Sequence, residues 1–394
     1  MERGKVALRG IACALALALA GCGPSGLRRS ASAAPPAPSS AIESAPLPVV
    51  GDRIGTGSVK IALIASLTGP SGANAVGVSM RNAAELAVAA FDSSPATLIV
   101  KDDKSSPAGA KAATQAALAE GADLVLGPLF AANVREAASV ARAANKPIIA
   151  FSTDPALAGR GVYLLSFLVE SYVDRIVDFA AARGKRSMAA LIPDSDYGRL
   201  AEAAFMTAAA RNNVRVVAVE RRRAGASADS AAQTIASLGA DIDALFIPEQ
   251  AEAMAEVSQS LARAGINGGR VQILGTGLWN DARVLKISAL QGAWFAAPDN
   301  AGFNTFAMSY RDRFGADPSR VATLAYDAAA LSIALAHQQS GQGFSAGALQ
   351  GESGFNGTDG LFRFRADGLN ERGLTVQMID QGTTTVISPA PKTF

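Results

Sequence analysis

The chain has 394 residues, of which 49% are hydrophobic, and its 36 Lys and Arg residues nearly balance its 34 Asp and Glu residues. Without residues 1–21, which hold three basic side chains and one acidic one, the chain has 33 of each sign and a formal side-chain charge of zero, which argues against a nucleic acid or an anionic membrane surface as the partner. His337 is the only histidine, so no histidine metal cluster is expected, and the sequence contains neither a phosphate-binding glycine motif nor a G-x-S-x-G nucleophile elbow. We therefore expect a protein without catalytic residues, cofactor or metal.

The first 21 residues are typical of an export signal. Arg3, Lys5 and Arg9 precede an apolar stretch over residues 11–20, which is too short to span a bilayer as a helix. Leu19-Ala20-Gly21-Cys22 resembles the lipobox of bacterial lipoproteins, which implies cleavage before Cys22 and lipidation of that cysteine. An ordinary signal with an incidental cysteine is the alternative. Gly23 agrees with export of such a lipoprotein to the outer membrane.

Residues 22–57 have a different composition. They are rich in Gly, Ala, Ser and Pro and show no hydrophobic period, which predicts a disordered tether between a lipid anchor and the folded part. With Cys13 in the removed segment and Cys22 carrying lipid, no disulfide is expected.

From residue 58 onward, short apolar runs alternate with Ala-rich stretches of helical length, a pattern typical of parallel strands joined by helices. Most runs are apolar throughout, as expected when helices cover both faces of a sheet. This number of strands predicts an α/β fold with two doubly wound lobes. The predicted strands are 59–67, 96–103, 122–128, 146–152, 186–195, 214–220, 243–249, 270–277 and 292–298, a long helix is predicted over 318–338, and antiparallel edge strands over 360–388.

A series of motifs in this part carries a resemblance. "KIALIASLTGPSGANAVGVSM", "KDDKSSPAGAKAATQ", "FSTDPAL" and "IPDSDYGRLAEAAF" resemble, in this order, the leucine-binding class of type I periplasmic binding proteins. The resemblance implies two lobes joined by three crossovers, near Phe167, residues 299–303 and residues 355–360. Lobe 1 then comprises 58–167 and 303–355, and lobe 2 comprises 168–302 and 356–394. Ligand would be held in the cleft between the lobes, which close on it.

The candidate cleft residues follow the predicted strands, although each could instead be a turn or cap residue. Thr153 and Tyr197 match the ligand-facing threonine and tyrosine of the family, whereas "LFAAN" lacks the usual serines and "TGLW" lacks the glutamate for a ligand ammonium, which argues against a free α-amino acid. Phe130, Trp279 and Trp294 are candidate aromatic anchors, although Trp294 lies in a predicted strand and is expected to be a core residue. The full set is Ser66, Thr68, Ser71, Leu129, Phe130, Ser152, Thr153, Asp154, Asp194, Tyr197, Glu249, Thr276 and Trp279.

Further motifs narrow the expected function. "GPLFAANV", "LGTGLWND" and "PAPKTF" resemble the penicillin-binding protein activators, outer-membrane lipoproteins that contact and stimulate peptidoglycan synthases. The leading hypothesis is such a non-enzymatic regulator, with a small polar ligand or cell-wall component in its cleft. The alternative is the substrate-binding component of an ABC importer for an amino acid or similar solute, with an ABC permease as partner. A cell-wall enzyme is the third hypothesis. Arg221, Arg222 and Arg223 are expected to face solvent.

Overall fold

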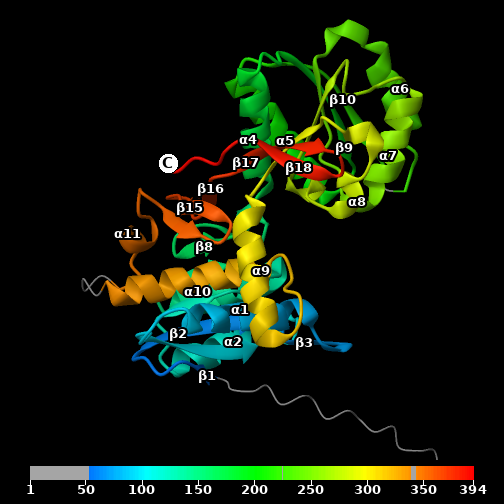
Figure 1. Cartoon of the computed structure of the whole chain (residues 1–394). Coiled ribbons are helices and arrows are strands. Elements are labelled where there is room, and N and C mark those ends of the chain that lie inside the picture. Colours follow the sequence, from blue (N-terminus) through cyan, green and yellow to red (C-terminus); the bar gives the residue numbers. More distant parts are fainter. Residues whose placement is uncertain (1–52, 224, 339–342) are drawn as a thin grey trace, which may run out of the picture. The chain divides into compact units, whose positions relative to one another are not determined.

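The computed structural model describes residues 53–223, 225–338 and 343–394, all of which belong to one compact unit (Figure 1). The predicted signal, the lipidation site Cys22 and residues 22–52 of the predicted tether lie outside the described residues. No helix in the part of the chain that the structure describes is both long and apolar enough to span a membrane.

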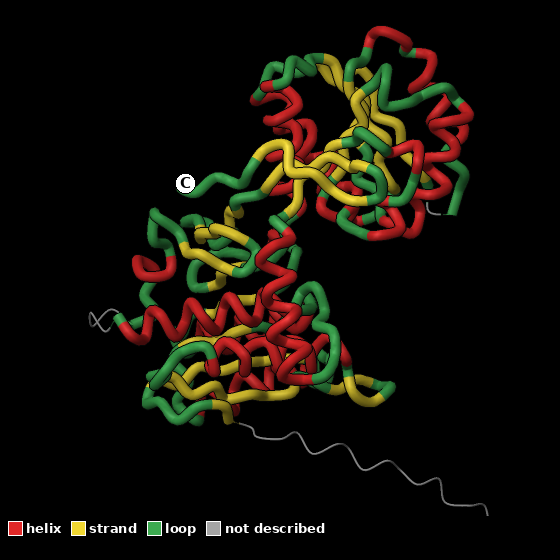
Figure 2. Tube along the Cα trace, viewed as in Figure 1, coloured by secondary structure: helices red, strands yellow, loops and turns green. Residues whose placement is uncertain are grey.

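The first lobe is built on a six-stranded sheet (Figure 2). Its strands are parallel except for β1, which pairs antiparallel with β5. Helices α1 and α10 cover one face of the sheet and pack on one hydrophobic cluster. Helices α2 and α3 cover the other face and pack on a second cluster. In sheet order the strands are β1 (Arg53–Ile54), β5 (Ala96–Asp102), β2 (Val59–Ala65), β6 (Leu124–Leu126), β7 (Ile148–Ala150) and β8 (Val162–Leu164). The helices are α1 (Ala75–Ala89), α2 (Pro107–Ala119), α3 (Ala131–Ala143), α9 (Asn300–Phe314), α10 (Ala322–His337) and α11 (Ala346–Leu349).

Two features of this lobe differ from the sequence expectation. β1 lies inside the predicted tether, because residues 53–54 pair with the edge strand β5 and Arg53 forms an ion pair with Glu120 at 2.7 Å. β8 was not predicted, although its residues Val162–Leu164 are apolar and buried like those of the other short parallel strands. The helix predicted over 318–338 is present as α10, a buried helix over residues 322–337.

The second lobe is built on a seven-stranded sheet. Its last two strands are antiparallel additions to one edge, which confirms the prediction for that part of residues 360–388. Helices α4 and α5 pack on one hydrophobic cluster, and α6, α7 and α8 contribute to the other. In sheet order the strands are β10 (Arg215–Arg222), β9 (Ser187–Pro193), β11 (Ala244–Phe246), β12 (Gln272–Gly275), β13 (Trp294–Ala297), β17 (Thr375–Asp380) and β18 (Thr383–Ser388). The helices are α4 (Val169–Ala182), α5 (Asp196–Arg211), α6 (Asp229–Ser237), α7 (Ala251–Arg263) and α8 (Ala282–Leu285).

Both sheets share one topology. The second parallel strand in chain order lies outside the first, and the third lies on the first strand's other side. After the first connection the chain moves toward one edge of the sheet, and after the second it moves toward the other edge. The switch points therefore lie between β2 and β6 in one lobe and between β9 and β11 in the other. In open α/β sheets, ligands bind outside the carboxyl ends of the strands at such switch points. The fold thus assigns one candidate surface to each lobe.

The connections between the lobes converge on Arg320. Its guanidinium lies 4.8 Å from the ring of Phe167 and 4.6 Å from that of Phe303, and it forms an ion pair with fully buried Asp359 at 2.5 Å. Phe167 and Phe303 lie at the first two predicted crossovers. Arg320 thereby contacts the first two connecting regions and the segment over residues 355–360.

The third crossover lies later than predicted. Residues 355–360 belong to a small antiparallel sheet, and its Phe362 and Phe364 pack in a hydrophobic cluster of the first lobe. The chain joins the second sheet only at β17, after Gly373 and Leu374. The strands of the small sheet are β14 (Phe355–Gly357), β15 (Gly360–Phe364) and β16 (Asn370–Arg372).

Candidate functional site

In the first lobe, the switch point brings Ser66 against the start of α1. Ser66 follows β2 and is 4% exposed, and among the described residues its Oγ has no hydrogen-bond partner. The Asn74 side chain caps α1 by accepting from the backbone N–H groups of Val76 and Gly77. A side chain at Gly77 would collide with the Ser66 carbonyl oxygen, 1.9 Å from an added Cβ. A hydroxyl beside a helix N-terminus favours an anionic group.

The other candidates of the first lobe divide between local structure and exposed surface. The Thr68 hydroxyl donates to Asp102 at 2.5 Å, and Ser152 and Asp154 accept from nearby backbone N–H groups, so all three stabilise turns. Ser71 and Thr153 are exposed, and Leu129 packs partly on the core. Phe130 is 46% exposed and precedes α3. With Ser66 and Asn74, Phe130 lines a cavity of about 10 Å³, room for about one water molecule.

In the second lobe, two predicted residues meet directly. The Tyr197 hydroxyl, in the first turn of α5, donates to the Thr276 Oγ1 atom at 2.8 Å. Burial raises the pKa of the Tyr197 phenol, and the neighbouring Tyr172 and Glu170 raise it further. Burial also raises the pKa of Tyr172 to about 12. Both phenols are therefore neutral hydrogen-bonding groups at physiological pH.

Glu249 and the arginine triplet are arranged differently from the sequence expectation. Arg222 is 9% exposed, not solvent-facing, because alternation along β10 turns it inward, where Nη2 and Nε donate to Glu249 at 2.6 and 3.0 Å. Glu249 is itself 5% exposed. Arg221 points outward and pairs with Glu202. The Glu249 carboxylate is thus neutralised within the protein, whereas Asp194 is exposed.

Trp279 is a core residue. It is fully buried in a hydrophobic cluster of the second lobe, and its ring packs so closely on Gly275 that an added Cβ would lie 2.2 Å from the indole. Its Nε1 has no partner among the residues that the structure describes. The candidate anchor Trp279 is therefore not surface-accessible, whereas Phe130 is.

Sequence reasoning missed Glu170 and Tyr172 in the first turn of α4. A helix that precedes a parallel strand begins at the carboxyl edge of the sheet, so the position of α4 before β9 could have indicated them. Gly277, which follows β12, makes room for Tyr172, since an added Cβ would lie 2.6 Å from the phenol ring. The second-lobe surface therefore combines Glu170, Tyr172, Tyr197 and Thr276.

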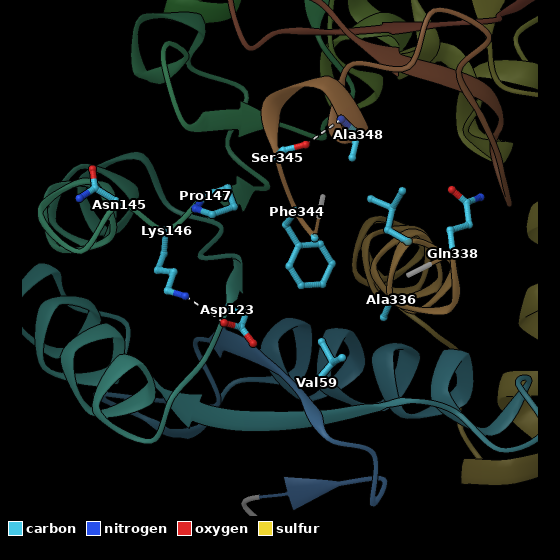
Figure 3. A pocket seen from close by; sticks show the side chains of 12 residues that line it. Val59, Asp123, Asn145, Lys146, Pro147, Ala336, Gln338, Phe344, Ser345 and Ala348 are labelled. Carbon is cyan, nitrogen blue, oxygen red and sulfur yellow. Dashed lines mark hydrogen bonds and ion pairs between the residues drawn. The ribbon is translucent and has the colours of Figure 1, made fainter. Parts of the chain in front are cut away.

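A larger cavity lies at the other edge of the first sheet (Figure 3). Its volume is about 600 Å³, and its lining includes Val59 at the start of β2 and Lys146, which forms an ion pair with Asp123 at 2.9 Å. Because these residues precede their strands, the cavity is remote from the switch point in topology. Within the described ranges, no group of three or more Asp, Glu, His or Cys side chains is placed to hold a metal ion.

Comparison with known proteins agrees with this topology. Residues 58–384 match the family described as "Periplasmic binding protein". The chain belongs to this family. No curated protein matches the sequence significantly. Membership in the periplasmic binding protein family implies a periplasmic location and a ligand-binding, non-enzymatic role.

Solved structures share the fold of this periplasmic binding protein at low identity. A putative branched-chain amino acid ABC transporter protein from Rhodospirillum rubrum superposes with a TM-score of 0.75 at 18% identity, over 84% of this chain and 99% of that one. A substrate-binding protein from Desulfitobacterium hafniense in complex with Leu gives 0.61 at 18%, over 84% and 99%. A solute-binding protein from Rhodopseudomonas palustris in complex with 3,4-dihydroxybenzoic acid gives 0.59 at 20%, over 84% and 96%.

Proposed function

We propose that this protein is the substrate-binding component of an ABC importer for a small organic solute with a carboxylate group, such as an amino acid. The observation that carries the proposal is Ser66, whose buried Oγ lies at the first-lobe switch point beside the start of α1 without a partner among the described residues. A carboxylate would supply the missing acceptor and interact favourably with the helix N-terminus.

The comparisons support this function over synthase activation. The similar structures described above come from ABC transporter systems, and the ligands named for two of them, leucine and 3,4-dihydroxybenzoic acid, share a carboxylate. In the proposed mechanism, solute binds the first lobe through its carboxylate and then contacts the second lobe. Only the closed form touches the solute from both sides, so binding shifts the population toward closure.

A thermal-shift panel tests the proposal. The purified chain would be screened against the twenty amino acids, benzoate and 3,4-dihydroxybenzoate. A true ligand at 100 times its Kd stabilises the folded state by about 2.7 kcal/mol, which a melting curve resolves. Ser66→Ala should weaken that ligand about 5- to 100-fold, as expected for loss of a hydrogen bond to a charged group. Ser353→Ala, an exposed serine, is the control. If no compound raises Tm, the proposal is wrong.

The activator role remains a second candidate, and Phe130 is the observation that favours it. A phenylalanine 46% exposed at the switch point resembles the aromatic anchors that carry much of the energy of protein interfaces. Pull-down of the lipidated chain would distinguish the two roles. Recovery of an ABC permease supports import. Recovery of a peptidoglycan synthase, lost in Phe130→Ala, supports activation.

Lipid anchoring through Cys22, preferably in the outer membrane, is also part of the proposal. The support is the lipobox-like sequence that ends at Cys22, together with Gly23. An anchored binding protein would act near a membrane without a spanning segment of its own.

A further inference from the structure

The second lobe has an acidic side chain whose role the fold leaves open. Glu170 lies in the first turn of α4, at the same edge of the sheet as Tyr197 and Thr276. We propose that Glu170 is the specificity-determining residue that binds a cationic group, such as an ammonium, on the solute. This inference rests on the proposed function and deepens it, because it predicts a ligand with both a carboxylate and a cation.

One oxygen of the Glu170 carboxylate lacks a donor in the part of the chain that the structure describes. This atom, Oε2, is buried. An ionised oxygen that is removed from water without a donor is unfavourable. A ligand ammonium would supply the missing donor and an opposite charge at once.

Two phenols and two guanidinium groups act in this region. Glu170 and Tyr172 both act electrostatically on the Tyr197 phenol, and Arg320 and Arg372 act on the Tyr172 phenol. Neither arginine donates to the Glu170 Oε2 atom, which has no hydrogen-bond partner among the described residues. Tyr172 and Tyr197 are neutral aromatic side chains, of the kind that attracts cations.

Other acids near this edge already have partners or water. Glu249 is bound twice by Arg222, and Asp196 forms an ion pair with Arg199. Asp194 is exposed to solvent and pays no such burial penalty. Glu170 therefore differs from these three acids in having a buried oxygen without a donor. This also resolves the lack of an acidic residue in "TGLW", since the carboxylate for an ammonium would come from α4.

Paired ligands test the inference on the full chain. The amino acid that raises Tm most in the panel would be compared with its des-amino acid, for example L-leucine with 4-methylpentanoate, by calorimetric titration. We expect Glu170→Gln to weaken the amino acid about 10- to 100-fold and to leave the des-amino acid within about threefold. Asp174→Asn is the matched control, because Asp174 lies one turn further along α4 and pairs with Arg211; it should change neither affinity.

A second readout does not depend on a ligand. Replacing a carboxylate whose Oε2 is buried without a donor by a neutral amide should raise the Tm of the ligand-free Glu170→Gln variant, whereas loss of a structural contact would lower it. A lower Tm, or equal weakening of both ligands, overturns the assignment of Glu170. Stabilisation by benzoate or 3,4-dihydroxybenzoate but by no amine also overturns it, while the importer proposal survives. If no compound in the panel raises the Tm, both the importer proposal and the assignment of Glu170 are wrong.

Discussion

At the scale of single residues, buried charges distinguish this protein most clearly. Arg222 and Glu249 form a buried ion pair in the second lobe, whereas Asp327 is 3% exposed and only its Oδ1 has a donor, the Thr358 N–H at 2.7 Å. Arg222 and Glu249 neutralise each other. Asp327 Oδ2, by contrast, has no hydrogen-bond partner in the described part of the chain. Loss of one partner and change of pH should therefore affect these sites in different ways.

Replacing Glu249 should strongly destabilise the second lobe. Glu249→Ala leaves the Arg222 guanidinium buried without a counter-charge, and breaking a buried pair in this way costs about 3–5 kcal/mol. Urea unfolding would measure the change. Glu202→Ala, which removes the partner of exposed Arg221, is the control and should cost less than about 1 kcal/mol. If both substitutions lower the free energy of unfolding by the same amount, burial does not make the Arg222–Glu249 pair more important than the exposed pair.

Asp327 should make stability depend on pH. Burial raises the pKa of its carboxyl from 3.8 to about 6, partly opposed by Arg372. The folded state therefore holds this proton more tightly than the unfolded state. The resulting stabilisation is fully present below about pH 4 and is lost as pH rises to about 6, at most by about 3 kcal/mol. Comparing urea unfolding of the wild type and Asp327→Asn at pH 4 and pH 7 measures it. If the wild type and Asp327→Asn lose the same free energy of unfolding between pH 4 and pH 7, the prediction is wrong.

At the scale of elements, the connections between the lobes depend on close backbone contacts. Gly302 in α9 packs against Thr358, just before β15, and Arg320 joins the same region through Asp359. Phe167 and Phe303 pack on the Arg320 guanidinium. These contacts bring segments that are far apart in sequence to one place.

Gly302→Ala should disturb this region. An added Cβ would lie 1.9 Å from the Thr358 carbonyl oxygen, so α9 or the chain before β15 must shift. Such overpacking typically costs about 1–3 kcal/mol, and we expect a loss of this size in urea unfolding. Gly347→Ala in α11 is the matched control, because nothing lies within 4 Å of its added Cβ. The contact is unimportant if both variants are as stable as the wild type.

At the scale of the whole molecule, the proposed function requires two lobes that act together. The described compact unit contains both candidate surfaces, and the predicted lipid site lies outside the described residues. A clamp of two lobes can respond to a solute only if the solute interacts more strongly with the closed form than with the open form. The charges at the two switch points, a helix N-terminus in one lobe and a carboxylate in the other, are the means we infer for that difference.

Cys22→Ser should release the protein from membranes. The lipobox-like motif predicts that Cys22 carries lipid, so the variant should lose incorporation of labelled palmitate and appear in the soluble envelope fraction. Cys13→Ser should keep the label, because Cys13 lies in the predicted signal. Labelling of the Cys22→Ser protein would show that the motif has been misinterpreted.

Much of the architecture followed from local sequence. Apolar runs such as residues 59–67 and 243–249 indicated strands because burial on both faces requires continuous apolar side chains. Strand ends then identified Ser66, Tyr197 and Thr276, since the carboxyl ends of parallel strands meet at one edge. Two-residue β1 escaped detection because its pairing depends on the neighbouring strand β5. β8 was missed although its three residues are apolar.

The sequence by itself determined the class of fold, the order of most strands and helices and the edge of each sheet at which the candidate residues lie, because these depend on local periodicity and chain direction. Only the tertiary structure decided that Trp279 is core, that Arg222 pairs with Glu249 and that Glu170 acts electrostatically on Tyr197. The physical reason is that burial and pairing are properties of space. A charged side chain contributes to a site only when no partner distant in sequence has already neutralised it.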